Sequence, residues 1–193
     1  IFEKWEGPIL QKFKSDKDLT HLNNKFDEKI NHIYDTVSIV RASLDKNKSL
    51  IGFAGSPWTV ISYMLEGKGK QDFSVSKNFL YTKKKLALQL TDIITDKTIE
   101  YLSGQIGAGA DVIQLFDSWS GVLSGEEYDD FVIKPTKKIV NSIKDKYQEI
   151  PIITYWGIAR WPFMSKTTFT GSANGTGKFE IFTVLSTRQT RGR

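Results

Sequence analysis

The sequence predicts an α/β protein in which short buried strands alternate with long helices. Three apolar runs, at residues 49–53, 111–116 and 151–155, are separated by stretches whose apolar residues recur every three or four positions. Short apolar runs that alternate with helical stretches are typical of parallel β/α units. A doubly wound sheet and a β/α barrel both fit this order. Because a whole barrel usually needs about 250 residues, the chain would supply about three units of one.

Apolar spacing and capping residues define the first two helices. The first is predicted over residues 22–44, with one buried stripe. The stripe consists of Leu22, Phe26, Ile30, Ile33, Val37, Val40 and Leu44. After the first strand, Ser56 and Pro57 supply an N-cap and a first-turn proline for a helix that ends near Glu66.

The two later helices are longer. Residues 77–106 are predicted as one helix, in which the lysines at 83–85 face solvent and Gly107 ends the helix. Residues 126–147 form the other helix. Pro135 breaks or kinks it near its middle, because proline cannot donate the helical hydrogen bond. Helices therefore separate the predicted strands, as parallel pairing requires.

The composition restricts the chemistry. With 193 residues, the chain is long enough for one domain with a core. It has no cysteine, and its two histidines, His21 and His32, lie in one early stretch without a metal-binding pattern of carboxylates. We therefore expect no metal site. No apolar run approaches the roughly 20 residues that cross a bilayer, so we expect no membrane span.

The net charge of +5 belongs to the end of the chain. Residues 157–193 hold six basic residues against the single Glu180, so residues 1–156 are neutral overall. We therefore expect a globular body over residues 1–156 and a basic tail over residues 157–193. The tail is rich in Ser, Thr and Gly and is expected to be poorly ordered. A neutral body presents no basic face, so no nucleic-acid partner is expected.

Two segments rich in polar and aromatic residues directly follow predicted strands. The first begins at Gly52 as GFAGSPWT and continues from Tyr63 as YMLEG; the second begins at Gln114 as QLFDSWSG. In parallel β/α folds, ligand sites collect at the carboxyl ends of the strands. These segments are therefore the candidate site. Glycines such as Gly55 and Gly121 also allow tight turns, whatever else the segments do.

The same two segments resemble the uroporphyrinogen decarboxylase family. The run GFAGSPWTVISYMLEGKGKQDF is similar to one segment of that family, and the later run QIGAGADVIQLFDSWSGVLS is similar to another. The resemblance covers residues 1–155 and leaves the tail unmatched, so we expect the chain to be an internal piece of a longer protein. It implies a partial (β/α)8 TIM barrel of roughly three central β/α units.

The resemblance also implies a reaction and partners. Members of the family are cytoplasmic homodimers that convert the four acetates of uroporphyrinogen III to methyls, giving coproporphyrinogen III, without a cofactor. Protonating a pyrrole carbon makes the ring its own electron sink. Loss of carbon dioxide therefore needs charge stabilisation and desolvation rather than a metal or a pyridoxal group.

Three positions match residues that contact the substrate in this family. Tyr63 matches a tyrosine whose hydroxyl donates to a substrate carboxylate, and Ser118 matches a hydroxyl residue that hydrogen-bonds the bound tetrapyrrole. Phe53 matches an aromatic residue that packs against the macrocycle. Asp117 is expected to orient its turn instead, because a carboxylate would repel a substrate that carries eight carboxylates.

Other parts of the family's site have no counterpart here. The arginine-rich motif that clamps substrate carboxylates is absent, and so is the C-terminal histidine region. The family's catalytic aspartate lies upstream of residue 1, so no catalytic residue is expected in this chain. We therefore expect the chain to be inactive alone. Two alternatives remain open. One is a corrinoid-dependent methyltransferase of the same superfamily, against which the lack of cysteine weighs; the other is a decayed, non-catalytic fragment.

Overall fold

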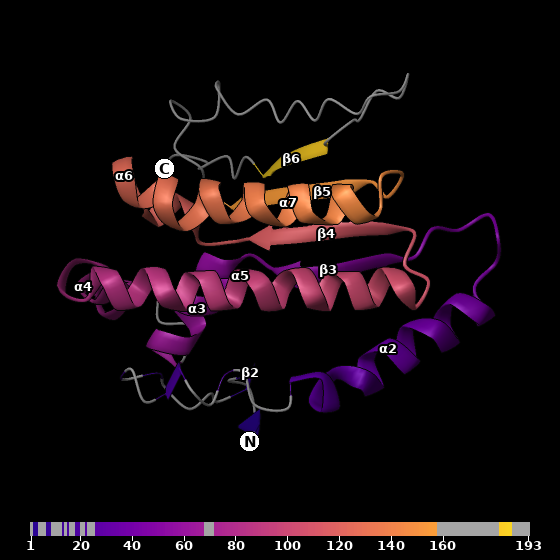
Figure 1. The fold of residues 1–193 in the computed structure, drawn as a ribbon, viewed down its shortest axis with the longest axis horizontal. Helices are drawn as coiled ribbons and strands as arrows, with labels where there is room; N and C mark the ends of the chain where they lie inside the picture. Colours follow the sequence, from indigo (N-terminus) through magenta and orange to yellow (C-terminus); the bar gives the residue numbers. More distant parts are fainter. Residues whose placement is uncertain are drawn as a thin grey trace, which may run out of the picture.

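The computed structural model describes residues 2–3, 7–8, 13, 15, 18–19, 22, 26–67, 72–157 and 182–186. Near the start of the chain, two short strands, β1 (Phe2–Glu3) and β2 (Gly7–Pro8), form an antiparallel pair. The remaining described strands belong to one separate, four-stranded sheet (Figure 1).

The three strands predicted from the sequence are neighbours in this sheet. Strand β3 (Ile51–Gly55) pairs in parallel with β4 (Val112–Asp117), and β4 pairs in parallel with β5 (Ile152–Gly157). Each strand starts one or two residues later than predicted. Strand order and direction are those that consecutive β/α units of a barrel require, so the predicted fold class is confirmed.

A fourth strand, β6 (Phe182–Ser186), pairs in parallel with β5. It lies inside the tail that the composition predicts to be poorly ordered. The rest of that tail, residues 158–181 and 187–193, is outside the described residues, so its order stays a prediction.

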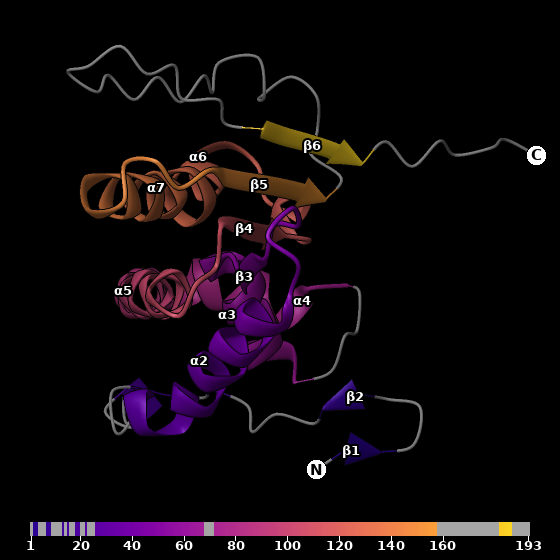
Figure 2. The same ribbon diagram turned by 90° about the vertical axis from the view of Figure 1, so that its right-hand side faces the viewer.

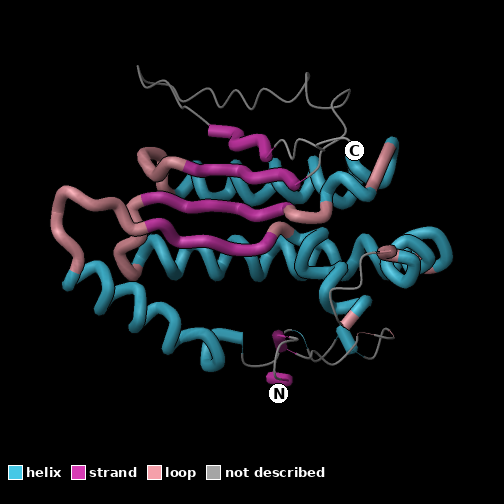
Figure 3. The backbone as a smooth tube through the Cα atoms, turned by 180° about the vertical axis from the view of Figure 1, so that it is seen from behind, coloured by secondary structure: helices cyan, strands magenta, loops and turns pink. Residues whose placement is uncertain are grey.

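Two long helices, α5 (Lys84–Gly107) and α7 (Lys134–Lys146), pack against each other along one face of the sheet (Figure 2). Seen from the opposite side, the strands lie in front of both helices (Figure 3). Helix α3 (Pro57–Glu66) follows β3 directly, and α4 (Ser74–Thr82) precedes α5. The sheet therefore has one covered face and one face that the described helices leave open.

The helix predicted over residues 77–106 is in fact two helices. Lys83 has a φ of −134° and a ψ of 43°, which is not helical, and it separates α4 from α5. Leu80 and Leu86 on either side are both buried in the same hydrophobic cluster, so the apolar spacing continues through the break. All three lysines at 83–85 are exposed, as predicted.

The break predicted at Pro135, near the middle of residues 126–147, is confirmed, because the helical stretch there is divided into separate segments. A single turn, α6 (Gly125–Tyr128), is followed by a π-helical turn (Asp129–Ile133), and Pro135 stands in the first turn of α7. Proline has no N–H to donate to the carbonyl four residues earlier, so the wider π turn forms where the α-helical bond is lost.

Helix α2 (Phe26–Ser43) packs against α5 and then leads through a loop into β3 (Figure 3). The ring of Tyr34 packs directly against Gly104 of α5. It lies so close that a Cβ atom at position 104 would overlap the ring. Val37 packs against the core, but Val40 is 40% exposed, so its predicted place in the buried stripe is wrong. The face of α2 that includes Tyr34 and Val37 turns toward α5.

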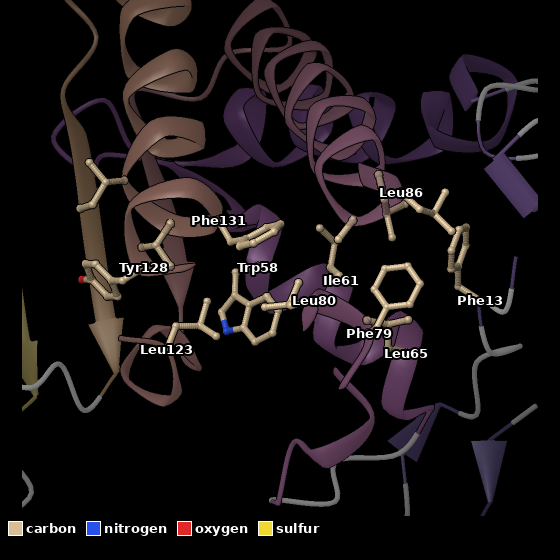
Figure 4. Packing of buried hydrophobic residues seen from close by; sticks show 14 residues of the cluster. Phe13, Trp58, Ile61, Leu65, Phe79, Leu80, Leu86, Leu123, Tyr128 and Phe131 are labelled. Atoms are coloured by element: carbon tan, nitrogen blue, oxygen red, sulfur yellow. The ribbon is translucent and has the colours of Figure 1, made fainter. Parts of the chain in front are cut away.

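Two hydrophobic clusters form the core. The first surrounds Trp58, whose ring lies 6.5 Å from that of Phe131 and beside Ile61, Leu80 and Leu123 (Figure 4). The second fills the space between the sheet and the helices α5 and α7. Its buried members are Ala54, Leu102, Ala110, Ile113, Leu115, Ile139, Val140, Ile143 and Ile152. The core thus lies on one side of the sheet and beyond the carboxyl end of β3.

Candidate functional site

The open face of the sheet carries a row of three aromatic rings. The ring of Phe53 on β3 lies 5.9 Å from that of Phe116 on β4, and the ring of Phe116 lies 5.8 Å from that of Tyr155 on β5. Successive residues of a strand point to opposite faces, and the neighbouring Ala54 and Leu115 are buried on the helix side. The row therefore crosses three neighbouring strands on the open face.

Phe53 is 59% exposed, although it is a large apolar side chain within a strand. Phe116 and Tyr155 are half-buried. Contacts between aromatic rings contribute about 1 kcal/mol each, but they leave most of the Phe53 ring in solvent. Exposed apolar surface of this kind is typical of a face that a ligand or another part of a protein covers.

A second aromatic group lies beyond the carboxyl ends of β3 and β4. Tyr63 on α3 is 42% exposed, and its ring lies 6.4 Å from that of Trp119. The ring centroids of Trp119 and Phe73 are also 5.0 Å apart. The backbone carbonyl of Trp119 accepts a hydrogen bond from Nε1 of the buried Trp58, at 3.0 Å. These contacts hold the turn after β4 against α3.

Ser118 is half-buried in this turn, one residue before Trp119. The structure therefore brings the predicted residues Tyr63 and Ser118 into the same region, through Trp119. It places Phe53 in the aromatic row, and no ring contact among the described residues links that row to the Tyr63 group. All three predicted residues lie in β3, in the helix that follows it, or directly after β4.

Asp117, at the end of β4, is fully buried and joins the two sequence segments. Its Oδ1 accepts a hydrogen bond from Oγ1 of Thr59 at 2.8 Å, and the hydroxyl of Ser120 donates to its backbone carbonyl at 3.1 Å. Burial raises the pKa of Asp117 to about 7, against the opposing effects of Thr59 and of the N–H groups of Trp119 and Ser120. Asp117 thus orients the turn that carries Ser118. The Asp117 side chain itself has no exposed surface that could contact a ligand.

Glu66, in the YMLEG segment, also has a structural partner. Its Oε1 accepts hydrogen bonds from both the N–H and the hydroxyl of Ser76, at 2.8 and 2.7 Å, in the first turn of α4. A carboxylate is favourable near a helix N-terminus, where backbone N–H groups lack partners. Glu66 therefore joins the end of α3 to the start of α4.

Sequence reasoning missed Phe116 and Tyr155. Both lie in predicted strands, but a continuous apolar run does not show which of its residues face the helices. The signal that could have identified them is the strand register. In the register observed, Phe116 pairs with both Gly55 and Tyr155, which puts the two aromatic residues on one face.

The described residues show no group of three or more His, Cys, Asp and Glu side chains that could hold a metal ion. His32 lies exposed on α2, and His21 is outside the described ranges. Within those ranges, no helix combines the length and the apolar character that a membrane span needs.

Comparison with known proteins supports one family over most of the chain. The family model for uroporphyrinogen decarboxylase (URO-D) matches residues 1–175. Uroporphyrinogen decarboxylases from Rickettsia bellii and Rickettsia felis are 54% and 52% identical to the chain over 154 residues. The match covers 80% of this chain but only 45% and 44% of those relatives, so the chain spans less than half of their length.

A solved structure described as a methyltransferase from Methanosarcina mazei has the same fold. It superposes with a TM-score of 0.61 and 19% sequence identity, over 76% of this chain and 41% of that one. At this identity the likeness concerns the fold alone. The family match over residues 1–175 and the relatives at about half identity establish that the chain belongs to the uroporphyrinogen decarboxylase family.

Proposed function

We propose that the chain is part of a uroporphyrinogen decarboxylase, a carboxy-lyase, and that it supplies one wall of the tetrapyrrole site. The observation that carries this proposal is the row of Phe53, Phe116 and Tyr155 on the open face of the sheet. Parallel strands lie about 4.8 Å apart, so a row across three of them offers the broad apolar surface that a macrocycle needs.

The residues of this wall have distinct proposed roles. Phe53 packs against the macrocycle, and the half-buried Phe116 and Tyr155 extend that contact across the sheet. The hydroxyl of Tyr63 donates a hydrogen bond to a substrate carboxylate, and the hydroxyl of Ser118 donates to the bound tetrapyrrole. When the substrate covers this face, it excludes water, and each of these hydrogen bonds becomes stronger.

The proposed reaction needs no cofactor. A proton added to a pyrrole carbon gives a cationic ring. The bond between the acetate methylene and its carboxylate then breaks, and its electron pair flows into that ring. Carbon dioxide leaves, and a second proton, added to the methylene carbon, completes the methyl group. Loss of the first proton from the ring carbon then restores the neutral pyrrole, so one proton is consumed overall. The proposed setting is a cytoplasmic homodimer of the longer protein.

The chain alone is proposed to be inactive. It holds neither the arginine-rich clamp nor the aspartate that would stabilise the cationic ring, and the loss of one preorganised electrostatic group commonly costs about 10²–10³ in rate. The test is anaerobic incubation of the chain with uroporphyrinogen III, followed by chromatography of the products. Decarboxylated product above the blank without protein would contradict inactivity of the chain alone.

A chimaera tests the function itself. Joining the chain to the segments that flank the matched region in the Rickettsia bellii relative should restore conversion to coproporphyrinogen III. In that chimaera, Tyr63→Phe, Ser118→Ala and Phe53→Ala should each lower kcat/KM by about tenfold or more, which corresponds to the loss of one contact. Tyr81→Phe, at an exposed tyrosine of α4, is the matched control and should have no effect. A soluble, folded chimaera without activity would refute the proposal.

A further inference from the structure

Phe73 has a backbone conformation that is rare for its residue type. It directly precedes α4, and its φ of 52° and ψ of 23° lie in the left-handed region. Within the described ranges it is the one residue other than glycine with a positive φ. A bulky side chain in this region is strained, because its Cβ crowds the backbone. Such strain persists only where neighbouring contacts hold the residue in place.

Capping of α4 does not account for this conformation. Phe73 occupies the N-cap position, but its side chain makes no capping hydrogen bond. Two carboxylates bind the first turn of the helix instead. Oδ1 of Asp72 accepts a hydrogen bond from the N–H of Ser74 at 3.2 Å. Oε1 of Glu66 accepts one from the N–H of Ser76 at 2.8 Å. The side chain at position 73 is therefore available for another contact.

That contact is with Trp119. The side chain of Phe73 is 6% exposed, and its ring centroid lies 5.0 Å from that of Trp119. The φ and ψ of a residue set the direction in which its side chain leaves the backbone. The left-handed conformation thus directs the ring from the start of α4 to the turn after β4. The ring of Tyr63 also lies near that of Trp119, with centroids 6.4 Å apart. Trp119 therefore has one aromatic partner in α3 and another just before α4.

The backbone of the turn after β4 is fixed at the same residue. The carbonyl of Trp119 accepts a hydrogen bond from Nε1 of Trp58, which is wholly buried. A displacement of the Trp119 ring would therefore disturb this hydrogen bond, and with it the position of the adjacent Ser118. Tyr63 and Ser118, the two residues whose hydroxyls are proposed to bind the substrate, thus share one neighbour. Phe73 packs against that neighbour.

We propose that Phe73 is a positioning residue for the tetrapyrrole site. Its left-handed backbone places its ring against Trp119, and through Trp119 it fixes both the turn that carries Ser118 and the ring of Tyr63. Phe73 is buried and acts without contacting the substrate itself. The hold on Trp119 is independent of any ligand. Its importance for a tetrapyrrole rests on the proposed function.

Hydrogen exchange of the Trp58 indole tests this hold, because the indole N–H donates to the carbonyl of Trp119. In the ¹⁵N-labelled chain, Phe73→Leu should speed exchange of this N–H by at least about fivefold, since a less firmly held Trp119 breaks the hydrogen bond more often. Phe79→Leu is the matched control. Phe79 lies in α4, is 7% exposed, and has a ring contact with Phe13. This control should lower the urea midpoint by a similar amount but leave the Trp58 exchange close to that of the unmodified chain.

Further variants separate the backbone strain from the ring contact. Phe73→Gly and Phe73→Ala both remove the ring, so both should speed the Trp58 exchange, and they supply the measurement if Phe73→Leu does not fold. Phe73→Gly should have the higher urea midpoint of the two, because glycine adopts a positive φ without strain. At Phe79, inside a helix, the same two substitutions should have the reverse order. Phe73→Tyr keeps the ring and should keep the exchange slow. Unchanged Trp58 exchange in a folded Phe73→Leu chain, an equal increase in Phe79→Leu, or a higher midpoint for Phe73→Ala than for Phe73→Gly would overturn the proposal.

Binding of uroporphyrin, followed by its fluorescence, separates this proposal from the proposed function. If the unmodified chain binds uroporphyrin, Phe73→Leu should weaken that binding severalfold, whereas Phe79→Leu and Phe73→Tyr should not. Equal binding by Phe73→Leu and the unmodified chain would overturn the positioning role. If the Trp58 exchange responds to Phe73 but the unmodified chain binds no uroporphyrin, the proposal that this chain supplies a wall of the tetrapyrrole site fails, while the hold on Trp119 stands.

Discussion

The two faces of the sheet formed by β3, β4 and β5 have opposite surroundings. On the covered face, Ile113, Leu115 and Ile152 are almost wholly buried beneath α5 and α7. On the open face, Phe53 is mostly exposed and Phe116 is half-buried. Because adjacent residues of a strand point to opposite faces, the groups that stabilise the fold and the groups proposed to bind a ligand alternate along the same strands. Stability and binding are thus separable by single substitutions.

The largest effect on stability is expected for a substitution on the covered face. Leu115→Ala should lower the free energy of unfolding by about 2–5 kcal/mol, because it removes buried methyl groups and leaves a cavity between the sheet and its helices. Urea titration followed by circular dichroism measures this loss. An unchanged urea midpoint would mean that the two faces do not differ as described.

Asp117 should make stability depend on pH. Its pKa in the folded chain is about 7, above the value of about 4 in an unfolded chain, so between these values the folded state keeps a proton that the unfolded state has lost. The contribution of Asp117 to the free energy of unfolding should therefore be highest below pH 4, fall on the order of 4 kcal/mol as the pH rises to 7, and level off above it. Urea midpoints at pH 5 and pH 8 measure the fall. Asp117→Asn should remove most of this fall in the urea midpoint. An equal fall in the unmodified chain and in the variant would show that other groups cause it.

Glu66, the last residue of α3, lies outside the sheet and should have an intermediate effect on stability. Glu66→Gln keeps an acceptor for Ser76 but removes the charge that strengthens both hydrogen bonds at the start of α4. The expected loss is about 1 kcal/mol in urea unfolding. Glu149→Gln, at an exposed position, is the control, and an equal loss there would exclude a specific role for Glu66.

The smallest effect on stability is expected for the open face. Phe53→Ala should cost about 1 kcal/mol or less, which is roughly the contribution of its ring contact with Phe116. The urea midpoint should therefore stay close to that of the unmodified chain. A loss as large as that of Leu115→Ala would show that the fold itself depends on the open face, and would end the distinction between the two faces.

The sequence predicts the strand order because each buried strand is an apolar run between helical stretches. It does not predict which face each strand residue occupies, since that depends on pairing with strands far along the chain, and so Phe116 and Tyr155 were missed. The two hydrogen bonds between the buried side chain of Gln105 and the backbone of Phe53 were missed for a related reason. A glutamine within a helical pattern normally faces solvent, and only the missing side chain of Gly52 lets its amide reach Phe53. The break at Lys83 escaped prediction because burial continues on both sides of it.

The pairing of Ile51 with Val112 also sets an order of events in folding. During synthesis β3 leaves the ribosome long before β4, and α3, α4 and α5 must all emerge before the two strands can pair. Helices form quickly from local contacts, whereas pairing of distant strands must wait for the loop between them to close. We therefore expect α3, α4 and α5 to form before β3 and β4 pair, so that the helices which cover the sheet are present when its strands come together.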